Sequence, residues 1–146
     1  MVFFPRKFLT KDEGDSIIRC IKDAEKMTSG EIRVHFQKKI KGSVEDSAAN
    51  AFLELKMDET EDRNGILFFI VPKKKVFAII GDKGIDEVVP QGFWDEVRDL
   101  LEVNFKKKQW KKGLCKAIAK TGEKLKKYFP IKENDKNELP DEISYS

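Results

Sequence analysis

The chain has 146 residues, of which 40% are hydrophobic and 38% charged, and its net charge is +3. A chain of this length can bury roughly 70% of its unfolded surface, so it can form one domain without stabilising cross-links. The small net charge does not indicate a nucleic-acid-binding protein, and no stretch approaches the ~18 apolar residues of a membrane span.

The cysteines and the N-terminus bear on the cellular compartment. Cys20 and Cys115 are far apart in helical patterns, no CxxC motif occurs, and His35 is the single histidine. A zinc site or a Cys–His nucleophile pair is therefore not expected. We predict two reduced thiols that face the core. The apolar run before Pro5 is too short for a signal peptide, so we predict a cytoplasmic protein.

A helix-capping motif and the spacing of apolar residues predict the first helix, the first strand and the second helix. Thr10 to Glu13 has the form of a capping box, and helical spacing of apolar residues predicts a helix over 10–28, with Gly30 just past its end. Strict alternation then predicts a strand with one buried face, which carries Ile32, Val34 and Phe36. Further apolar spacing predicts a second helix over about 44–57.

A continuous apolar run, residues 66–71, predicts a central strand covered on both faces. After a short turn at Pro72–Lys75, residues 76–80 complete a hairpin. Helical spacing predicts a third helix from Phe93 to Phe105 and a fourth from Trp110 to Phe129, which Pro130 ends. Residues 132–146 are mostly polar, and we expect a flexible tail after a single domain of residues 1–131.

This order of elements predicts an α/β fold, a three-layer α/β/α sandwich whose small mixed sheet carries two helices on each face. The first two strands form a right-handed βαβ unit and run parallel, and the third strand is antiparallel to the second. One edge of the sheet should therefore collect three segments, residues 29–31, 61–65 and 81–87.

These segments bring carboxylates, basic groups and flexible glycines together. Clustered carboxylates repel unless a cation lies among them or some are protonated, and hard oxygen ligands suit Ca²⁺ or Mg²⁺. We name Asp62 and Asp82 as the best metal ligands and Asp86 as the third. The alternatives stay open: Asp62 could cap a turn, Asp82 could end a strand, and Asp86 could favour the N-terminus of the next helix.

The same segments resemble a known family. Thr28–Val34 resembles the opening strand motif of TPM domains, Asp62–Leu67 their central strand motif, and Ile79–Ile85 with the following Phe93–Trp94 their hairpin end and next helix. The closing region Gly113–Pro130 fits as well, so the resemblance covers about residues 10–130. The family fold is an α/β/α sandwich, in agreement with the pattern above.

The resemblance also implies function. Some TPM proteins are described as acid phosphatases, others as photosystem-repair factors or receptor modulators. Many carry a signal peptide and a membrane anchor. We expect neither segment in this chain, so it is similar to the stand-alone soluble members. Divalent-cation binding near the loop after the third strand is implied, which corresponds to Asp82, with Asp62 opposite. We expect Ca²⁺ rather than Mg²⁺.

Two functions follow as hypotheses. The first is a weak metal-linked phosphatase for a phosphate-ester substrate, in which Asp62 and Asp82 hold the metal and Lys83 or Arg63 neutralises phosphoryl oxygens. The second is a non-enzymatic module that docks a protein partner through a metal-stabilised loop. Residues 106–127 hold ten lysines against one acid, but arginine, the usual base reader, is absent there, so we do not expect nucleic-acid binding.

Overall fold

The computed structural model describes residues 9–133 and 137–146. Its elements run in the order helix α1 (Lys11–Glu25), strand β1 (Glu31–Phe36), α2 (Val44–Glu54), β2 (Gly65–Val71), β3 (Val76–Gly81), α3 (Lys83–Asp86), α4 (Asp95–Lys106), α5 (Trp110–Leu125) and β4 (Ser144–Tyr145). Single turns of 3-10 helix, Met57–Glu59 and Pro72–Lys74, precede β2 and β3. The predicted helices and strands are all present, with ends shifted by a few residues.

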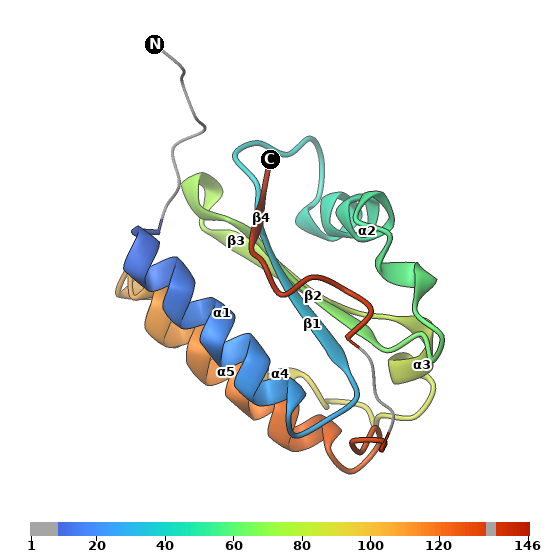
Figure 1. The fold of residues 1–146 in the computed structure, drawn as a ribbon. Coiled ribbons are helices and arrows are strands. Elements are labelled where there is room, and N and C mark those ends of the chain that lie inside the picture. The colour runs from blue at the N-terminus through green and yellow to red at the C-terminus, as the bar shows by residue number, and fades with distance from the viewer. Residues whose placement is uncertain (1–8, 134–136) are drawn as a thin grey trace.

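The sheet has the strand order β3-β2-β1-β4 (Figure 1). β1 pairs in parallel with β2, and β2 pairs antiparallel with β3, as the pattern predicted. All seven residues of β2 are buried, because this strand is central and both of its faces are covered. The predicted hairpin closes through Pro72–Lys74.

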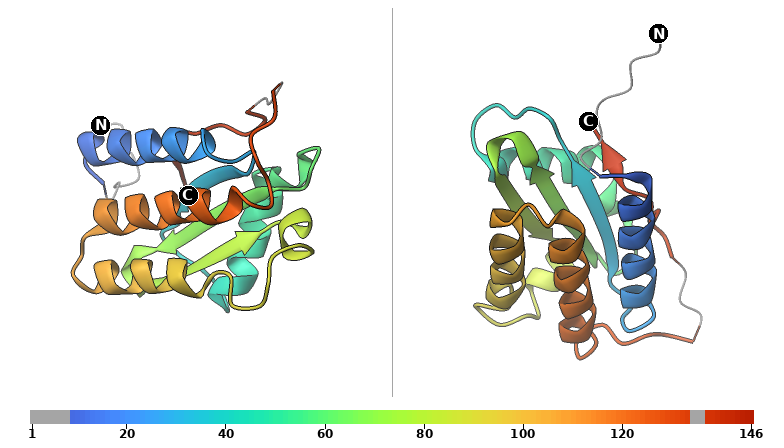
Figure 2. Two further views of the ribbon diagram at one scale, coloured as in Figure 1. Left: turned by 90° about the horizontal axis from the view of Figure 1, so that it is seen from below. Right: turned by 90° about the vertical axis from the view of Figure 1, so that its left-hand side faces the viewer.

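Helices cover both faces of the sheet, which confirms the three-layer sandwich, but their distribution is uneven (Figure 2). Residues of α1, α4 and α5 pack on the face that carries Val34 and Phe68, whereas α2 alone among the longer helices packs on the face of Leu67 and Phe69. The expectation of two helices on each face is therefore wrong. Periodicity shows that a helix buries one side, but it does not say which face of the sheet receives that side.

Helix α1 begins as its sequence predicts. The Thr10 hydroxyl accepts a hydrogen bond from the Glu13 amide at 3.1 Å, and the Glu13 carboxylate accepts one from the Thr10 amide at 3.0 Å. This capping box satisfies two amides that have no partner within the helix. Within the described residues, no helix is both long and apolar enough to cross a bilayer.

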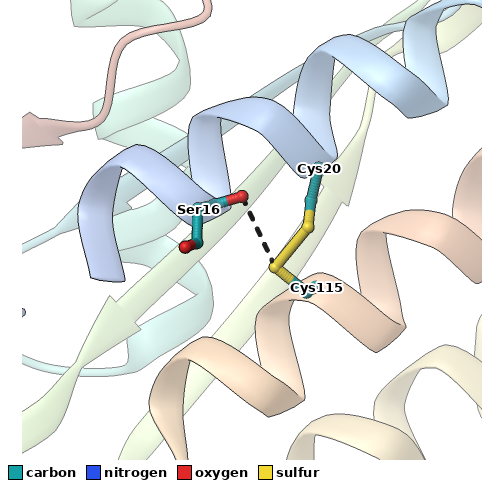
Figure 3. Close-up of a disulfide and its surroundings, with 3 residues drawn as sticks. All are labelled: Ser16, Cys20 and Cys115. Atoms are coloured by element: carbon teal, nitrogen blue, oxygen red, sulfur yellow. Dashed lines mark hydrogen bonds between the residues drawn. A yellow bond between two sulfur atoms is a disulfide. The ribbon is translucent and has the colours of Figure 1, made fainter. Parts of the chain in front are cut away.

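The two cysteines form a disulfide, contrary to the prediction of reduced thiols (Figure 3). Cys20 lies on α1 and Cys115 on α5, and the two Cα atoms are 5.5 Å apart. The contact could not be predicted, because the two residues are 95 positions apart in the sequence. Helical periodicity indicates that each cysteine lies on a packed face of its helix, but it does not show that these two faces pack against each other. The inference of a reducing compartment loses this support, and the cytoplasmic location stays a prediction.

The segment after α5 is attached to the domain over the part that the structure describes. Residues 144–145 form β4, which pairs in parallel with the outer edge of β1, and Leu139 is only 7% exposed. The expectation of a flexible tail therefore does not hold for residues 137–146, while residues 134–136 lie outside the described residues. Too few apolar residues mark this segment for a sequence pattern to reveal it.

Candidate functional site

The three segments predicted to converge do meet at one edge of the sheet, which we call the loop edge: residues 29–31, 61–65 and 81–87. The amide of Glu31 donates to the carbonyl oxygen of Asn64 at 3.0 Å, and the amide of Asp82 donates to that of Gly65 at 2.9 Å. The parallel β1–β2 pair and the antiparallel return of β3 together produce this convergence.

Asp82 is a buried acid of the loop edge, at 5% exposure, and it forms an ion pair with Arg63. Arg63 Nε lies 2.8 Å from Asp82 Oδ2, and Arg63 Nη2 lies 2.9 Å from Oδ1. Oδ1 also accepts a hydrogen bond from the Lys83 amide at 2.7 Å, which caps α3. Both carboxylate oxygens of this predicted metal ligand thus bond to predicted phosphate-binding residues.

Arg63 reaches Asp82 from an unusual backbone conformation. Its φ is +50°, in the left-handed region that costs a residue with a side chain roughly 1 kcal/mol. The carbonyl oxygen of Arg63 accepts a hydrogen bond from the Gly84 amide at 2.9 Å, which fixes the two loops together. A Cβ on Gly84 would lie 2.7 Å from that oxygen and closer still to the carbonyl oxygen of Asp62, so only glycine fits.

Asp62 lies on the same edge but pairs elsewhere. Its Oδ2 accepts a hydrogen bond from Lys132 Nζ at 2.6 Å, and its side chain is 39% exposed. The structure therefore gives each of the two favoured metal ligands a basic partner: Arg63 for Asp82 and Lys132 for Asp62.

Asp86 and Lys83 complete the predicted set. Burial, and after it the negative charge of Asp82, raises the pKa of the Asp86 carboxyl above its usual range. The Lys83 ammonium is 3.9 Å from Glu87 Oε1, and its side chain is 70% exposed. Asp86 thus lies against the buried acid, whereas the Lys83 side chain points along α3 into solvent.

The donor chemistry of the loop edge suits a hard cation, but the arrangement contains no ready-made metal centre. Within residues 9–133 and 137–146, no group of three acidic, histidine or cysteine side chains is arranged to hold an ion. Two oxygens at this edge, Ser29 Oγ and Asn64 Oδ1, are buried without a hydrogen-bond partner. A cation at Asp82 would have to replace the Arg63 guanidinium, since both carboxylate oxygens bond to it.

A hollow of about 380 Å³ opens beside Asp86, between α3 and α4. Asp86, the Trp94 ring and the Arg98 side chain line it. Arg98 Nη1 lies 3.4 Å from Asp95 Oδ1, so its charge is partly balanced on the same helix. The hollow is large enough for a small organic group next to the loop edge.

Sequence reasoning missed a second set of acids near this edge. The Glu25 carboxyl accepts a hydrogen bond from the Ile32 amide at 3.1 Å, and Glu31 accepts one from the Leu139 amide at 2.6 Å. Their acidic partners, Asp141 and Glu138, come from the last segment of the chain. No local pattern could indicate these pairs, because more than a hundred residues separate Glu31 from Leu139.

His35 is a hydrogen-bonded residue of the sheet. Its ring stacks on Phe69 with centroids 5.7 Å apart, and its nitrogens lie 2.6 Å from Ser144 Oγ and 2.8 Å from Ser146 Oγ.

In the lysine-rich helix α5, Lys120 and Lys124 both pair with Glu96 of α4.

Comparison with known proteins places this geometry in a family. The TPM phosphatase family model, described as a TPM domain, matches residues 2–124. The chain is similar to the BA42 protein from the psychrophilic bacterium Bizionia argentinensis, with 46% identity, a TM-score of 0.92 and 97% of each chain covered.

Two more distant structures share the fold. The N-terminal domain of cg2496 from Corynebacterium glutamicum has 14% identity and a TM-score of 0.64, with 79% of this chain and 72% of that one covered. An N-terminal domain from P. gingivalis has 14% identity and a TM-score of 0.67, with 84% and 79% covered. No curated protein sequence matches the chain. The family match spans most of the chain, and the chain therefore belongs to the TPM domain family.

Proposed function

We propose that this TPM domain binds a divalent cation at the loop edge and hydrolyses phosphate monoesters weakly there. The observation that carries the proposal is the buried Asp82 with Asp86 beside it, at the point where three loops converge. Asp82 and Asp86 lie close together and the Arg63 guanidinium pairs with Asp82, so ionisation of Asp86 adds a negative charge that a cation would compensate.

The ion pairs suggest how such a site would stay stable without an ion. Arg63 and Lys132 act as internal counter-ions for Asp82 and Asp62, and a cation binds by exchanging with them. Arg63 is 45% exposed, so its guanidinium has room to swing from Asp82 toward solvent or toward a phosphate. When bound, the cation would supply charge neutralisation for phosphoryl oxygens.

The remaining roles belong to basic and acidic side chains. Arg63 is suited to bind two phosphoryl oxygens at once, because its planar fork matches phosphate geometry. The Lys83 ammonium, held only loosely by Glu87, adds a second positive charge on the same loop. Asp86, with its raised pKa, is a candidate proton donor for a leaving group at mildly acidic pH.

Cation binding is tested by thermal melting of the full chain in EDTA, CaCl₂ and MgCl₂. An ion that binds only the folded state at ten times its Kd stabilises it by about 1.4 kcal/mol. We expect a larger rise in melting temperature with Ca²⁺ than with Mg²⁺, and its loss in Asp82→Asn. Asp99→Asn, an exposed acid on α4, is the matched control and should keep the rise. Identical melting in EDTA and both salts would contradict cation binding.

Arg63 separates the two parts of the proposal. Arg63→Gln removes the competing guanidinium, so we expect tighter cation binding together with slower phosphate release from an aryl phosphate. Weaker cation binding in this variant would refute the exchange of ions at Asp82. Background phosphate release by wild type, with and without chelator, would rule out the hydrolase.

A binding module is the second candidate. Its support is that the threonine hydroxyls next to the loop edge are engaged in structural hydrogen bonds and are not set up as nucleophiles. The Thr28 hydroxyl donates to the Phe129 carbonyl oxygen, and Thr60 Oγ1 accepts from the Asn64 amide. Neither is next to a histidine that could activate it. A protein partner that is captured by wild type and lost in Asp82→Asn, in the absence of phosphate release, would favour this candidate.

A further inference from the structure

The last segment of the chain, residues 137–146, lies along the outer edge of β1 (Figure 1). The Ser146 amide donates to the carbonyl oxygen of Phe36 at 2.9 Å, and the Lys38 amide donates to that of Ser146 at 2.9 Å. His35 pairs with Ser144 in this parallel register. The segment thus occupies the edge as an added strand does in peptide-binding proteins.

Apolar side chains of the segment bind on both sides of the sheet. Leu139, 7% exposed, packs in the cluster on the α2 side, with Met57 and Leu67. Tyr145 packs on the opposite side, where its ring stacks on Phe36 with centroids 5.8 Å apart. The β1 edge therefore holds a leucine on one side of the sheet and, six residues later, an aromatic residue on the other.

Acidic side chains hold the middle of the segment. The Glu31 carboxylate accepts the Leu139 amide at 2.6 Å, with Glu138 beside it, and the Glu25 carboxyl lies within hydrogen-bond reach of Asp141. Two carboxyl groups in contact repel each other unless one is protonated. Each of these pairs therefore needs a proton to hold the segment.

The direction of the proton linkage follows from burial. Burial, supported by Asp141, raises the pKa of Glu25 to about 9. Burial also raises the pKa of Glu31 to about 7, although hydrogen bonds from the backbone of Leu139 and Glu138 act in the opposite direction. A raised carboxyl pKa stabilises the docked state at low pH. This stabilisation is lost as pH rises, through about 7 for Glu31 and about 9 for Glu25.

Other charges at the groove act differently. Arg33 attracts Glu142 of the segment electrostatically. Burial lowers the pKa of His35, which also faces Gln37, Arg33 and Glu54, so its contribution weakens only as pH falls below its ordinary value of 6.5. The loss of stabilisation expected between pH 7 and pH 9 therefore comes from the two carboxyl pairs.

We propose that the β1 edge is a docking groove for an extended peptide, that residues 137–146 occupy it within the same chain, and that loss of protons from the two carboxyl pairs releases them. Release uncovers the backbone of β1 and the site of Leu139, so a segment from another molecule that presents the same apolar side chains without the two acids can then bind. The proposal is independent of cation binding and of phosphate hydrolysis at the loop edge.

The proton dependence is tested by amide hydrogen exchange of the full chain between pH 6 and 9, with intrinsic rates divided out. The protection of Leu139 and Ser146, relative to amides of β2, should fall by about tenfold or more. Glu25→Gln mimics the protonated side chain of one pair, so it should keep more of the protection at pH 9 than wild type does, whereas Glu102→Gln, an exposed acid on α4, should behave as wild type. If the protection of Leu139 and Ser146 relative to β2 does not change with pH, or if Glu25→Gln adds no protection at pH 9, the release of the segment by proton loss is wrong.

The groove is tested with a fluorescent decapeptide of sequence NELPDEISYS at pH 6. In the full-length variant Leu139→Ala/Tyr145→Ala, the chain's own segment binds the β1 edge more weakly, while the edge itself is unchanged. This variant should bind the decapeptide at least ~10-fold more tightly than wild type, because the wild-type segment competes at high local concentration. A decapeptide with alanine in place of leucine should bind weakly to both. Equal binding of the two decapeptides, or none by a folded variant, would overturn the groove.

Discussion

Removal of the Cys20–Cys115 disulfide should destabilise the domain strongly. The double substitution Cys20→Ser/Cys115→Ser deletes the bond between α1 and α5 without changing the size of either side chain much. Cys115 Sγ lies 3.7 Å from the carbonyl oxygen of Ser16, so a serine hydroxyl at position 115 finds an acceptor nearby (Figure 3). The native packing of the two helices should therefore survive, and the effect should arise in the unfolded state.

The magnitude follows from the loop that the bond closes. With a sequence separation of 95 residues, the chain-entropy model gives a stabilisation of about 4.7 kcal/mol at 25 °C. With an unfolding entropy of about 2.1 cal/mol/K per residue, this corresponds to a fall in melting temperature of about 15 °C.

The assay compares three samples by urea and thermal unfolding: oxidised wild type, wild type in reducing agent, and the double variant. We expect the last two to unfold together, well below the first, and non-reducing thiol titration of denatured wild type to find no free thiol. Two free thiols, or equal stability of all three samples, would refute the reasoning and restore the prediction of reduced cysteines.

Three further predictions concern local geometry. Gly84→Ala should cost about 1–3 kcal/mol and shift the loop edge, because its Cβ would clash with the carbonyl oxygens of Asp62 and Arg63; urea unfolding measures the loss, and unchanged stability would contradict the close approach. Gly122→Ala should also destabilise, despite the better helix propensity of alanine, since the added Cβ would lie 3.0 Å from the Cβ of Ala24; a gain in melting temperature would show that α1 and α5 can separate. Thr10→Ala should cost about 1 kcal/mol through loss of the α1 cap, with Thr10→Ser as the control that retains it.

The elements of the fold were predictable from local patterns. The alternation around Val34, the continuous apolar run of β2 and the capping box at Thr10 each depend on neighbours within a few residues, and the structure contains all three. The handedness of the βαβ unit then predicted the parallel strand pair and the convergence of the loop edge.

The candidate site was only half predictable. Topology brought Arg63, Asp82 and Asp86 to one edge. The alternative that Asp82 ends a strand also holds, since Asp82 directly follows β3, and it caps α3 as well. The ion pairs could not be foreseen. A positive φ at Arg63 directs its guanidinium onto Asp82, and Lys132 reaches Asp62 across 70 residues of sequence.

By itself, the sequence determined the four longer helices and the three inner strands, the order of those strands and the family resemblance, because each depends on short-range periodicity or on contiguous motifs. Only the tertiary structure decided three matters: that Cys20 meets Cys115, that three of the four longer helices share one face, and that residues 137–146 close the β1 edge. All three depend on contacts between segments far apart in the chain, and the patterns of the individual segments do not encode which partner each will meet.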